Sequence, residues 1–290
     1  MRRQMIKPSA PYDYLLILYV LALLLMGLLM VTSASINVSG QELHQPFYYF
    51  LRQSIYLFGG CLLGALVIQF EIETWERWSW FLLISALLAL TVVIIPGIGR
   101  SVNGSMRWIG VGGLGFQVSE FAKLAIIIYM SGYLWRHHHE IKTKLPGFLK
   151  PLGILAIVSL LLLREPDFGA LVVITVTTLG LMFLAGMRLR HFVLLFGVAV
   201  IGLSVLAMSA PYRLVRLTSF LNPWEHPFDS GYQLTQSLIA FGQGGWLGVG
   251  LGKSVQKLFY LPEAHTDFLF AVIAEELGLL GTMCIILLFT

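Results

Sequence analysis

The sequence predicts an all-α integral membrane protein, built as a polytopic helix bundle. Of its 290 residues, 57% are hydrophobic and 12% are charged, half the charged content of about 25% that soluble domains show. A water-soluble chain of this length cannot bury so much apolar surface in one or two cores, so the surplus must face lipid. These figures exclude a soluble enzyme, a disordered chain and a fibrous repeat.

Apolar stretches long enough to cross a bilayer predict the spans, since such a helix needs about 20 mostly apolar residues. Eight stretches meet or approach this length, and the last is still apolar when the chain stops at Thr290. The fourth is short and carries charged residues. The predicted spans are Tyr14–Ala34, Phe47–Gln69, Trp78–Pro96, Ser119–Trp135, Gly147–Leu163, Phe168–Gly186, His191–Ala210 and an incomplete eighth span after Asp267.

The distribution of lysine and arginine predicts the orientation of these spans. Short loops on one side hold most of the basic residues, and such loops face the cytoplasm. Residues 1–13 are therefore predicted to form a cytoplasmic tail, and residues 211–266 a large extracytoplasmic loop between spans 7 and 8. The Gly97–Gln117 loop and the Arg164–Asp167 corner face the same outer side.

The loops carry their own signals, although none suggests a second domain, and we interpret residues 1–290 as a single polytopic membrane domain. Two short apolar runs, Met106–Val111 and Leu114–Gln117, flank a Gly-Gly pair. This pattern predicts a small hairpin on the membrane surface. In the long loop, Asn222-Pro223-Trp224 and the Gly242–Gly252 cluster are expected to end any helix.

Two charged residues, Glu120 and Lys123, lie three positions apart at the start of the fourth span. This spacing puts both side chains on one helix face, where they can pair. Ionisable groups at membrane depth are costly and usually face a cavity or a partner, which favours a functional role. The alternative is a structural ion pair near the interface, with Lys123 extending toward water.

Asp167 follows Pro166 at the corner between the fifth and sixth predicted spans. Its carboxylate is expected to cap the next helix, where it interacts favourably with the helix dipole. Capping explains this residue fully, and a second role as an inward-facing ligand is left open.

Asp267 precedes the last apolar run, with His265 and Thr266 before it and Glu275-Glu276 after it. We expect Thr266 to be the N-cap, which puts Asp267 in the first turn of the helix. A carboxylate at the water–lipid boundary can act as a general base. The alternative is simple capping, with the two glutamates at a solvated turn.

Several other kinds of site are disfavoured. The basic residues are scattered among short loops, so the net charge of +4 does not suggest a nucleic-acid partner. Zinc needs more Cys and His at ligand spacing than the chain offers. The Gly252-Lys253-Ser254 tripeptide resembles a phosphate loop, but Leu247 stands where the motif needs its first glycine.

The chain contains five longer motifs: Asn103-Gly-Ser-Met-Arg-Trp-Ile, Gln117-Val-Ser-Glu-Phe-Ala-Lys, Glu165-Pro-Asp-Phe-Gly, Gln233-Leu-Thr-Gln-Ser-Leu-Ile-Ala-Phe-Gly and Leu261-Pro-Glu-Ala-His-Thr-Asp. Together they resemble the SEDS family (shape, elongation, division, sporulation) over essentially the whole chain. They are closer in sequence to the division members than to the elongation members. Val118 stands where the family often has proline.

This resemblance implies a multi-pass enzyme of the bacterial inner membrane that polymerises peptidoglycan glycan strands from lipid II. It further implies action at the division septum, beside a class B penicillin-binding protein and other division-complex proteins. The family usually has ten spans, so the last two are expected beyond Thr290. Its catalytic aspartate falls on Asp267, its paired Glu and Lys on Glu120 and Lys123, its loop arginine on Arg107, and its Glu-Pro-Asp aspartate on Asp167.

The expected reaction is an inverting glycosyl transfer in which Asp267 takes a proton from the acceptor hydroxyl and undecaprenyl pyrophosphate leaves. Cations must face the leaving group, and a divalent ion (Mg²⁺ or Mn²⁺) is expected to assist with no ligand set evident. Candidate substrate-binding residues are Arg107, Glu120, Lys123, Asp167, Arg213, Arg216 and His265. The alternatives are a lipid II flippase, since charges at depth often mark transport pathways, and a non-catalytic scaffold for the penicillin-binding protein.

Overall fold

The computed structural model describes residues 13–102, 105–111, 114–143 and 145–290. These residues form two compact units, each described by itself below. Inside several helices the side chains of some residues lie outside this description, among them those of Arg213 and Arg216.

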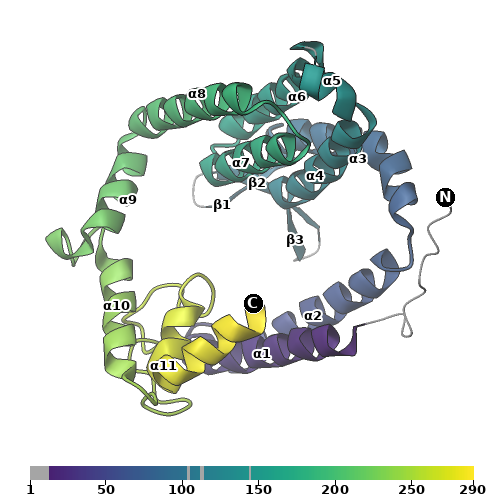
Figure 1. Ribbon diagram of the computed structural model, residues 1–290. Coiled ribbons are helices and arrows are strands. Elements are labelled where there is room, and N and C mark those ends of the chain that lie inside the picture. Colours follow the sequence, from purple (N-terminus) through teal and green to yellow (C-terminus); the bar gives the residue numbers. More distant parts are fainter. Residues whose placement is uncertain (1–12, 103–104, 112–113, 144) are drawn as a thin grey trace. The chain divides into compact units, whose positions relative to one another are not determined.

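Unit 1 comprises the described residues up to Val67 together with Pro211–Thr290. The last helix of this unit packs against both the first helix and the helix of the long loop (yellow, purple and light green in Figure 1). Buried Met30, Ala240 and Val272 come from these three helices and form the centre of its core. Its elements are α1 (Tyr14–Glu42), α2 (Tyr48–Val67), α9 (Pro211–Leu221), the short 3-10 helix η1 (Pro223–Glu225), α10 (Tyr232–Gly244) and α11 (Leu269–Phe289).

Unit 2 is Ile68–Ala210, and its core lies mainly among the helices Ile72–Val93, Val118–Arg136, Leu145–Arg164 and Phe168–Leu184. The fully buried small residues Ala86 and Ala122 lie on two of these helices, and small side chains let membrane helices approach closely. Its elements are α3 (Ile72–Val93), β1 (Arg100–Val102), β2 (Ser105–Val111), β3 (Leu114–Gln117), α4 (Val118–Arg136), α5 (His138–Thr143), α6 (Leu145–Arg164), α7 (Phe168–Leu184) and α8 (Leu189–Met208).

Each predicted span coincides with a helix: α1, α2, α3, α4, α6, α7, α8 and α11. Among the described residues, six helices are long and apolar enough to cross a membrane; α7 is apolar but shorter, and α4 is outside that set. All residues of α2 and α8 are at least partly exposed within their units. Apolar helices with this much exposed surface require a lipid solvent, so the chain is a multi-pass membrane protein.

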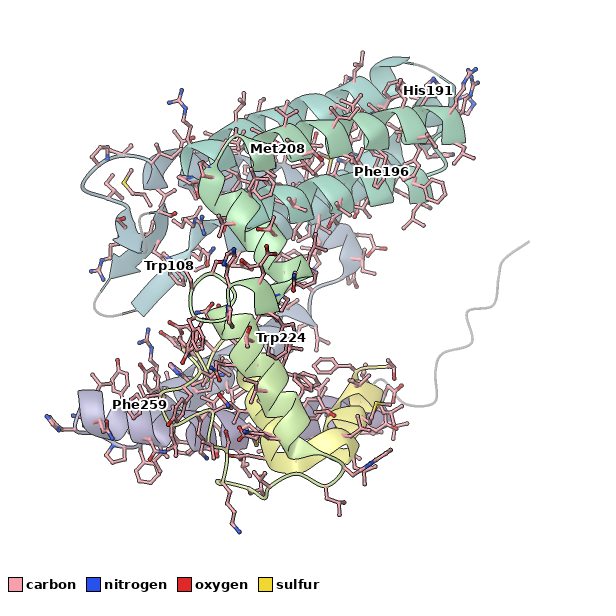
Figure 2. The ribbon with its side chains drawn as sticks, turned by 90° about the vertical axis from the view of Figure 1, so that its left-hand side faces the viewer. Trp108, His191, Phe196, Met208, Trp224 and Phe259 are labelled. Carbon is pink, nitrogen blue, oxygen red and sulfur yellow. The ribbon has the colours of Figure 1, made fainter. Side chains whose placement is uncertain are left out.

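The predicted antiparallel pairing of the two short apolar runs is confirmed. β2 pairs antiparallel with β3, from Trp108 opposite Gln117 to Val111 opposite Leu114. A third strand, β1, pairs with β2 and was not predicted, because three residues are too few to show alternation. Figure 2 shows Trp108 of this sheet at the opposite end of unit 2 from His191 in the first turn of α8, as the predicted orientation requires.

The first helix extends beyond its predicted end at Ala34 to Glu42. The added turns are rich in polar residues, and buried Ser39 donates its hydroxyl hydrogen bond to the carbonyl of Ser35 at 2.8 Å. Serine can satisfy its own polar group on the helix in this way. A fall in hydropathy therefore does not end this helix.

The last helix, α11, is broken at Gly278, where φ is 66° and ψ is −167°. A positive φ of this size favours glycine. The break removes helical partners from carbonyl groups before it and from N–H groups after it, and in lipid such groups must be satisfied within the protein. The sequence predicted a single span after Asp267 with no break at Gly278, and the structure corrects this prediction.

The glycine-rich loop 245–250 supplies the missing partners. Gly248 lies so close to α11 that a Cβ on it would collide with the carbonyl of Glu276. We call this contact between residues 245–250 and 275–280 the loop–helix joint. Its backbone hydrogen bonds run from Val249 N–H to Glu275 C=O (2.9 Å), Gly250 N–H to Glu276 C=O (3.0 Å), Leu279 N–H to Gly245 C=O (2.9 Å) and Leu280 N–H to Trp246 C=O (3.1 Å).

Replacing Gly248 with alanine is expected to lower the unfolding temperature by several degrees. The added methyl group would meet the Glu276 carbonyl, and the φ of +80° at this position is unfavourable for alanine. Gly242→Ala in α10 is the matched control, because its Cβ position has no described atom within 4 Å other than the adjacent residues and the backbone of its own helix. Thermal unfolding of the purified variants in detergent measures the difference, and equal values would contradict the tight joint.

Candidate active site

Arg107 on β2 reaches the corner between α6 and α7. Its guanidinium donates hydrogen bonds to the backbone carbonyls of Glu165, at 3.4 Å, and Pro166. The same group lies 3.8 Å from a carboxylate oxygen of Asp167. Because the Arg107 side chain remains 30% exposed, it joins the sheet to the corner and still faces solvent with part of its surface.

Asp167 is the N-cap of α7, as predicted. Its Oδ1 accepts a hydrogen bond from the backbone N–H of Ala170 at 3.2 Å. Its other oxygen, Oδ2, is buried and has no hydrogen-bond partner among the described residues. One oxygen of this carboxylate therefore has a structural role, and the other is left without a hydrogen-bond donor among the described residues.

Glu165 is fully buried beside Asp167. Neither of its carboxyl oxygens has a hydrogen-bond partner among the described residues. Burial, assisted by the negative charge of Asp167, raises its pKa from 4.5 to about 8, while Arg107 opposes the shift. Glu165 is therefore protonated and neutral near pH 7. Glu165 is not among the residues predicted from sequence, because adjacency to a capping aspartate gives no sign of burial.

Glu120 and Lys123 form the predicted pair at the start of α4. The Lys123 ammonium lies 2.8 Å from the Glu120 carboxylate. The lysine side chain is 24% exposed and the glutamate side chain 59%, so the pair lies at the edge of the fold. The position of the pair follows from β3, which ends immediately before α4 begins, and the pairing follows from the three-residue helical spacing.

Asp267 lies in a turn and is exposed. The predicted cap is wrong: α11 begins at Leu269 with Phe268 as its N-cap, so Asp267 precedes the helix. The hydroxyl of Thr266 bonds to the Glu263 carboxylate at 2.6 Å instead of capping a helix. The neighbouring His265 ring packs against Tyr49, with 4.5 Å between the ring centroids.

Glu275 and Glu276 form a buried polar cluster that sequence reasoning missed. They are 0% and 1% exposed, so the solvated turn considered for them is excluded. The Glu276 carboxylate accepts hydrogen bonds from the Lys257 ammonium at 2.6 Å and from the Ser33 hydroxyl at 3.1 Å. No short-range pattern could reveal a cluster whose members come from α1, the long loop and α11.

Two candidate cations, Arg213 and Arg216, belong to α9, but their side chains lie outside the described residues. Within the described ranges, no three His, Cys, Asp or Glu side chains gather as a metal site would require.

Replacing Glu165 with glutamine is expected to remove a pH dependence of stability. The folded-state pKa lies above the unfolded value, so the stability that neutral Glu165 contributes is complete below about pH 4.5 and is lost as the pH rises to about 8. The slope is up to about 1.4 kcal/mol per pH unit in this window. In thermal unfolding from pH 5 to 8, the unfolding temperature of the variant should therefore rise relative to that of the wild type as the pH rises.

Exposed Glu73, in the first turn of α3, provides the control for this measurement. Glu73→Gln should keep the pH dependence of the wild type. A constant difference between Glu165→Gln and the wild type across the same range would contradict a neutral buried Glu165.

Similar sequences were found over nearly the whole chain. A protein from Legionella pneumophila, named a probable peptidoglycan glycosyltransferase FtsW, is 54% identical over 98% of this chain and 72% of its own length. A Coxiella burnetii protein of the same name is 54% identical over 97% of this chain and 76% of its own.

Two solved structures share the fold. A chain of a peptidoglycan synthase complex, described as coordinating polymerization and crosslinking, superposes with a TM-score of 0.72 at 26% identity and covers 96% of this chain and 75% of that one. The rod shape determining protein RodA of Thermus thermophilus gives 0.65 at 25% identity, over 98% and 73%. The FtsW/RodA/SpoVE profile, described as a cell cycle protein, matches residues 14–290. The chain therefore belongs to this SEDS family of multi-pass membrane proteins.

Proposed function

We propose that this protein is a peptidoglycan glycosyltransferase that polymerises lipid II into glycan strands during septal cell-wall synthesis. The observation that carries this proposal is the similarity, at 54% identity over 98% of the chain, to a relative named as a peptidoglycan glycosyltransferase FtsW. The membrane helices fit a substrate whose polyprenyl tail remains in the bilayer. The large loop 211–266 then faces outward, where lipid-linked sugars present their head groups.

In the proposed reaction, Asp267 is the general base. Its carboxylate accepts the proton of a sugar hydroxyl on the acceptor lipid II. The resulting oxygen nucleophile attacks the anomeric carbon of the donor chain, a new glycosidic bond forms with inversion, and the bond to undecaprenyl pyrophosphate breaks. The exposure of Asp267 supports this role, because the acceptor must reach the carboxylate. His265, two residues away, is proposed to bind the same sugar region.

The leaving pyrophosphate develops negative charge, so the reaction needs positive groups near it. We assign this role first to Lys123 and Arg107, with Arg213 and Arg216 as further candidates. Glu120 is only 2.8 Å from the Lys123 ammonium, which supports a role in orienting that lysine and keeping it charged. The buried and unpartnered Oδ2 of Asp167 supports a role for this residue in binding substrate.

A divalent cation, Mg²⁺ or Mn²⁺, is proposed to accompany the pyrophosphate. Among the described residues, no three His, Cys, Asp or Glu side chains form a cluster that could hold it. We assign no protein ligand to this ion and no step that depends on it.

The proposed setting is the bacterial inner membrane at the division septum, with the N-terminus in the cytoplasm. The proposed partner is a class B penicillin-binding protein that crosslinks the product, within a larger division complex. The similarity to a chain from a complex that coordinates polymerization and crosslinking supports this pairing.

Asp267→Asn is expected to abolish glycan polymerisation, a loss of at least about 100-fold, because asparagine cannot accept the proton. The assay supplies lipid II to the purified full-length protein and its partner in detergent and measures glycan product. Binding of labelled lipid II should persist. Asp229→Asn, an exposed aspartate of the same loop, is the control and should leave the rate unchanged.

The same assay separates the alternative functions. A flippase would form no polymer in detergent, where there is no bilayer to cross. A scaffold would tolerate Asp267→Asn while the complex persists. Polymerisation by Asp267→Asn at the wild-type rate would overturn the assignment of the base.

A further inference from the structure

Two buried carboxylates, those of Glu275 and Glu276, lie where the two ends of the loop that carries Asp267 meet. Glu275 receives three hydrogen bonds from consecutive residues of the loop: from the Ser254 hydroxyl at 2.5 Å, the Val255 N–H at 2.8 Å and the Gln256 N–H at 3.3 Å. Three donors converging on one carboxylate specify the position of these residues closely. The segment is therefore held to α11 by side-chain contacts as well as by the loop–helix joint.

Glu276 forms an ion pair with Lys257 at the same end of the loop. The Lys257 ammonium lies 2.6 Å from Glu276 Oε1 and 2.9 Å from the Ser33 hydroxyl of α1, and the backbone N–H of Ser254 lies 3.4 Å from the same carboxylate. Lys257 is 3% exposed. A buried ion pair is a poor source of stability compared with apolar packing, and its best-attested use is to specify one arrangement over others.

The chain from residue 254 to residue 276 is thus a closed loop whose two ends meet at these carboxylates. Asp267 lies between the ends. Leu261 and Ala264 are buried against the core of unit 1, and the Leu261 N–H bonds to the Gln256 carbonyl at 2.9 Å. The segment that precedes Asp267 is therefore linked, through Leu261 and Gln256, to the residues that bind Glu275.

We propose that Glu275 and Glu276, with Lys257 and Ser254, are positioning residues that set the place of the Asp267 carboxylate. The proposal rests on the proposed function, in which Asp267 is the base. These residues touch no substrate. They act by fixing the segment 254–261, and a small displacement of a catalytic group can reduce turnover by about 100-fold.

The test compares Glu275→Gln with Ser254→Ala and Ser254→Thr. Glutamine keeps the shape at 275 but leaves one acceptor oxygen for three donors. Ser254→Ala removes one donor with little change in volume, and Ser254→Thr keeps the hydroxyl. Glu225→Gln, an exposed glutamate in η1 of the same loop, is the control.

Two measurements are made on the full-length protein with its partner. Hydrogen–deuterium exchange of the Val255 and Gln256 amides should become faster in Glu275→Gln, and this result does not depend on activity. In the lipid II assay, kcat should fall about 10- to 100-fold in Glu275→Gln while KM changes less than about threefold. Ser254→Ala should show a smaller fall that Ser254→Thr restores, which a loss of folded protein would not produce.

Wild-type exchange at Val255 and Gln256 in Glu275→Gln would overturn the proposal. So would faster exchange with a wild-type kcat. If Glu275→Gln does not fold, the Ser254 pair decides, because equal kcat in Ser254→Ala and Ser254→Thr overturns it. Failure of the proposed function looks different, since Asp267→Asn would then polymerise lipid II at the wild-type rate.

Discussion

The constraint on which unit 1 depends is that a helix broken within a membrane must have its backbone groups satisfied by protein. The break at Gly278 creates that requirement, and the loop 245–250 meets it with hydrogen bonds on both sides. Because the loop and α11 must approach within backbone contact, each has a glycine at the closest point, Gly248 in the loop and Gly278 in the helix. The contact also brings residues 254–256 of the loop to Glu275 and Glu276. The break in α11 therefore helps to place the segment of chain that leads to Asp267.

A second principle is that the few charged groups within the fold are neutralised locally. Lys257 and Glu276 pair in the core of unit 1, and Glu120 pairs with Lys123 at the edge of unit 2. At the α6–α7 corner, Arg107 lies beside Asp167, while burial keeps Glu165 protonated near pH 7. In surroundings of low dielectric, ion pairing and protonation compensate a buried charge, and buried Glu275 instead accepts three hydrogen bonds.

Much of the fold was predictable because its cause is local. The bilayer sets the length of an apolar run, and eight such runs became helices with ends within a few residues of those expected, except in α1 and at the start of α3. The pair at Glu120 and Lys123 follows from helical spacing, the cap at Asp167 from the preceding proline, and the hairpin from two runs around a Gly-Gly pair. The cap at Thr266 was wrong because the chain turns there, and Thr266 bonds to Glu263.

The amino-acid pattern was enough to predict the membrane class, the approximate spans and, through resemblance, the candidate residues Asp267, Glu120, Lys123 and Arg107. Contacts between residues far apart in the chain became known only from the folded structure. Ser33 and Glu276 are 243 positions apart, and Arg107 and Glu165 are 58 apart. Contacts at such separations depend on how helices pack, and neither hydropathy nor helical spacing carries that information. The break at Gly278 belongs to the same class, since a glycine in an apolar run becomes a break only when another segment is present to satisfy it.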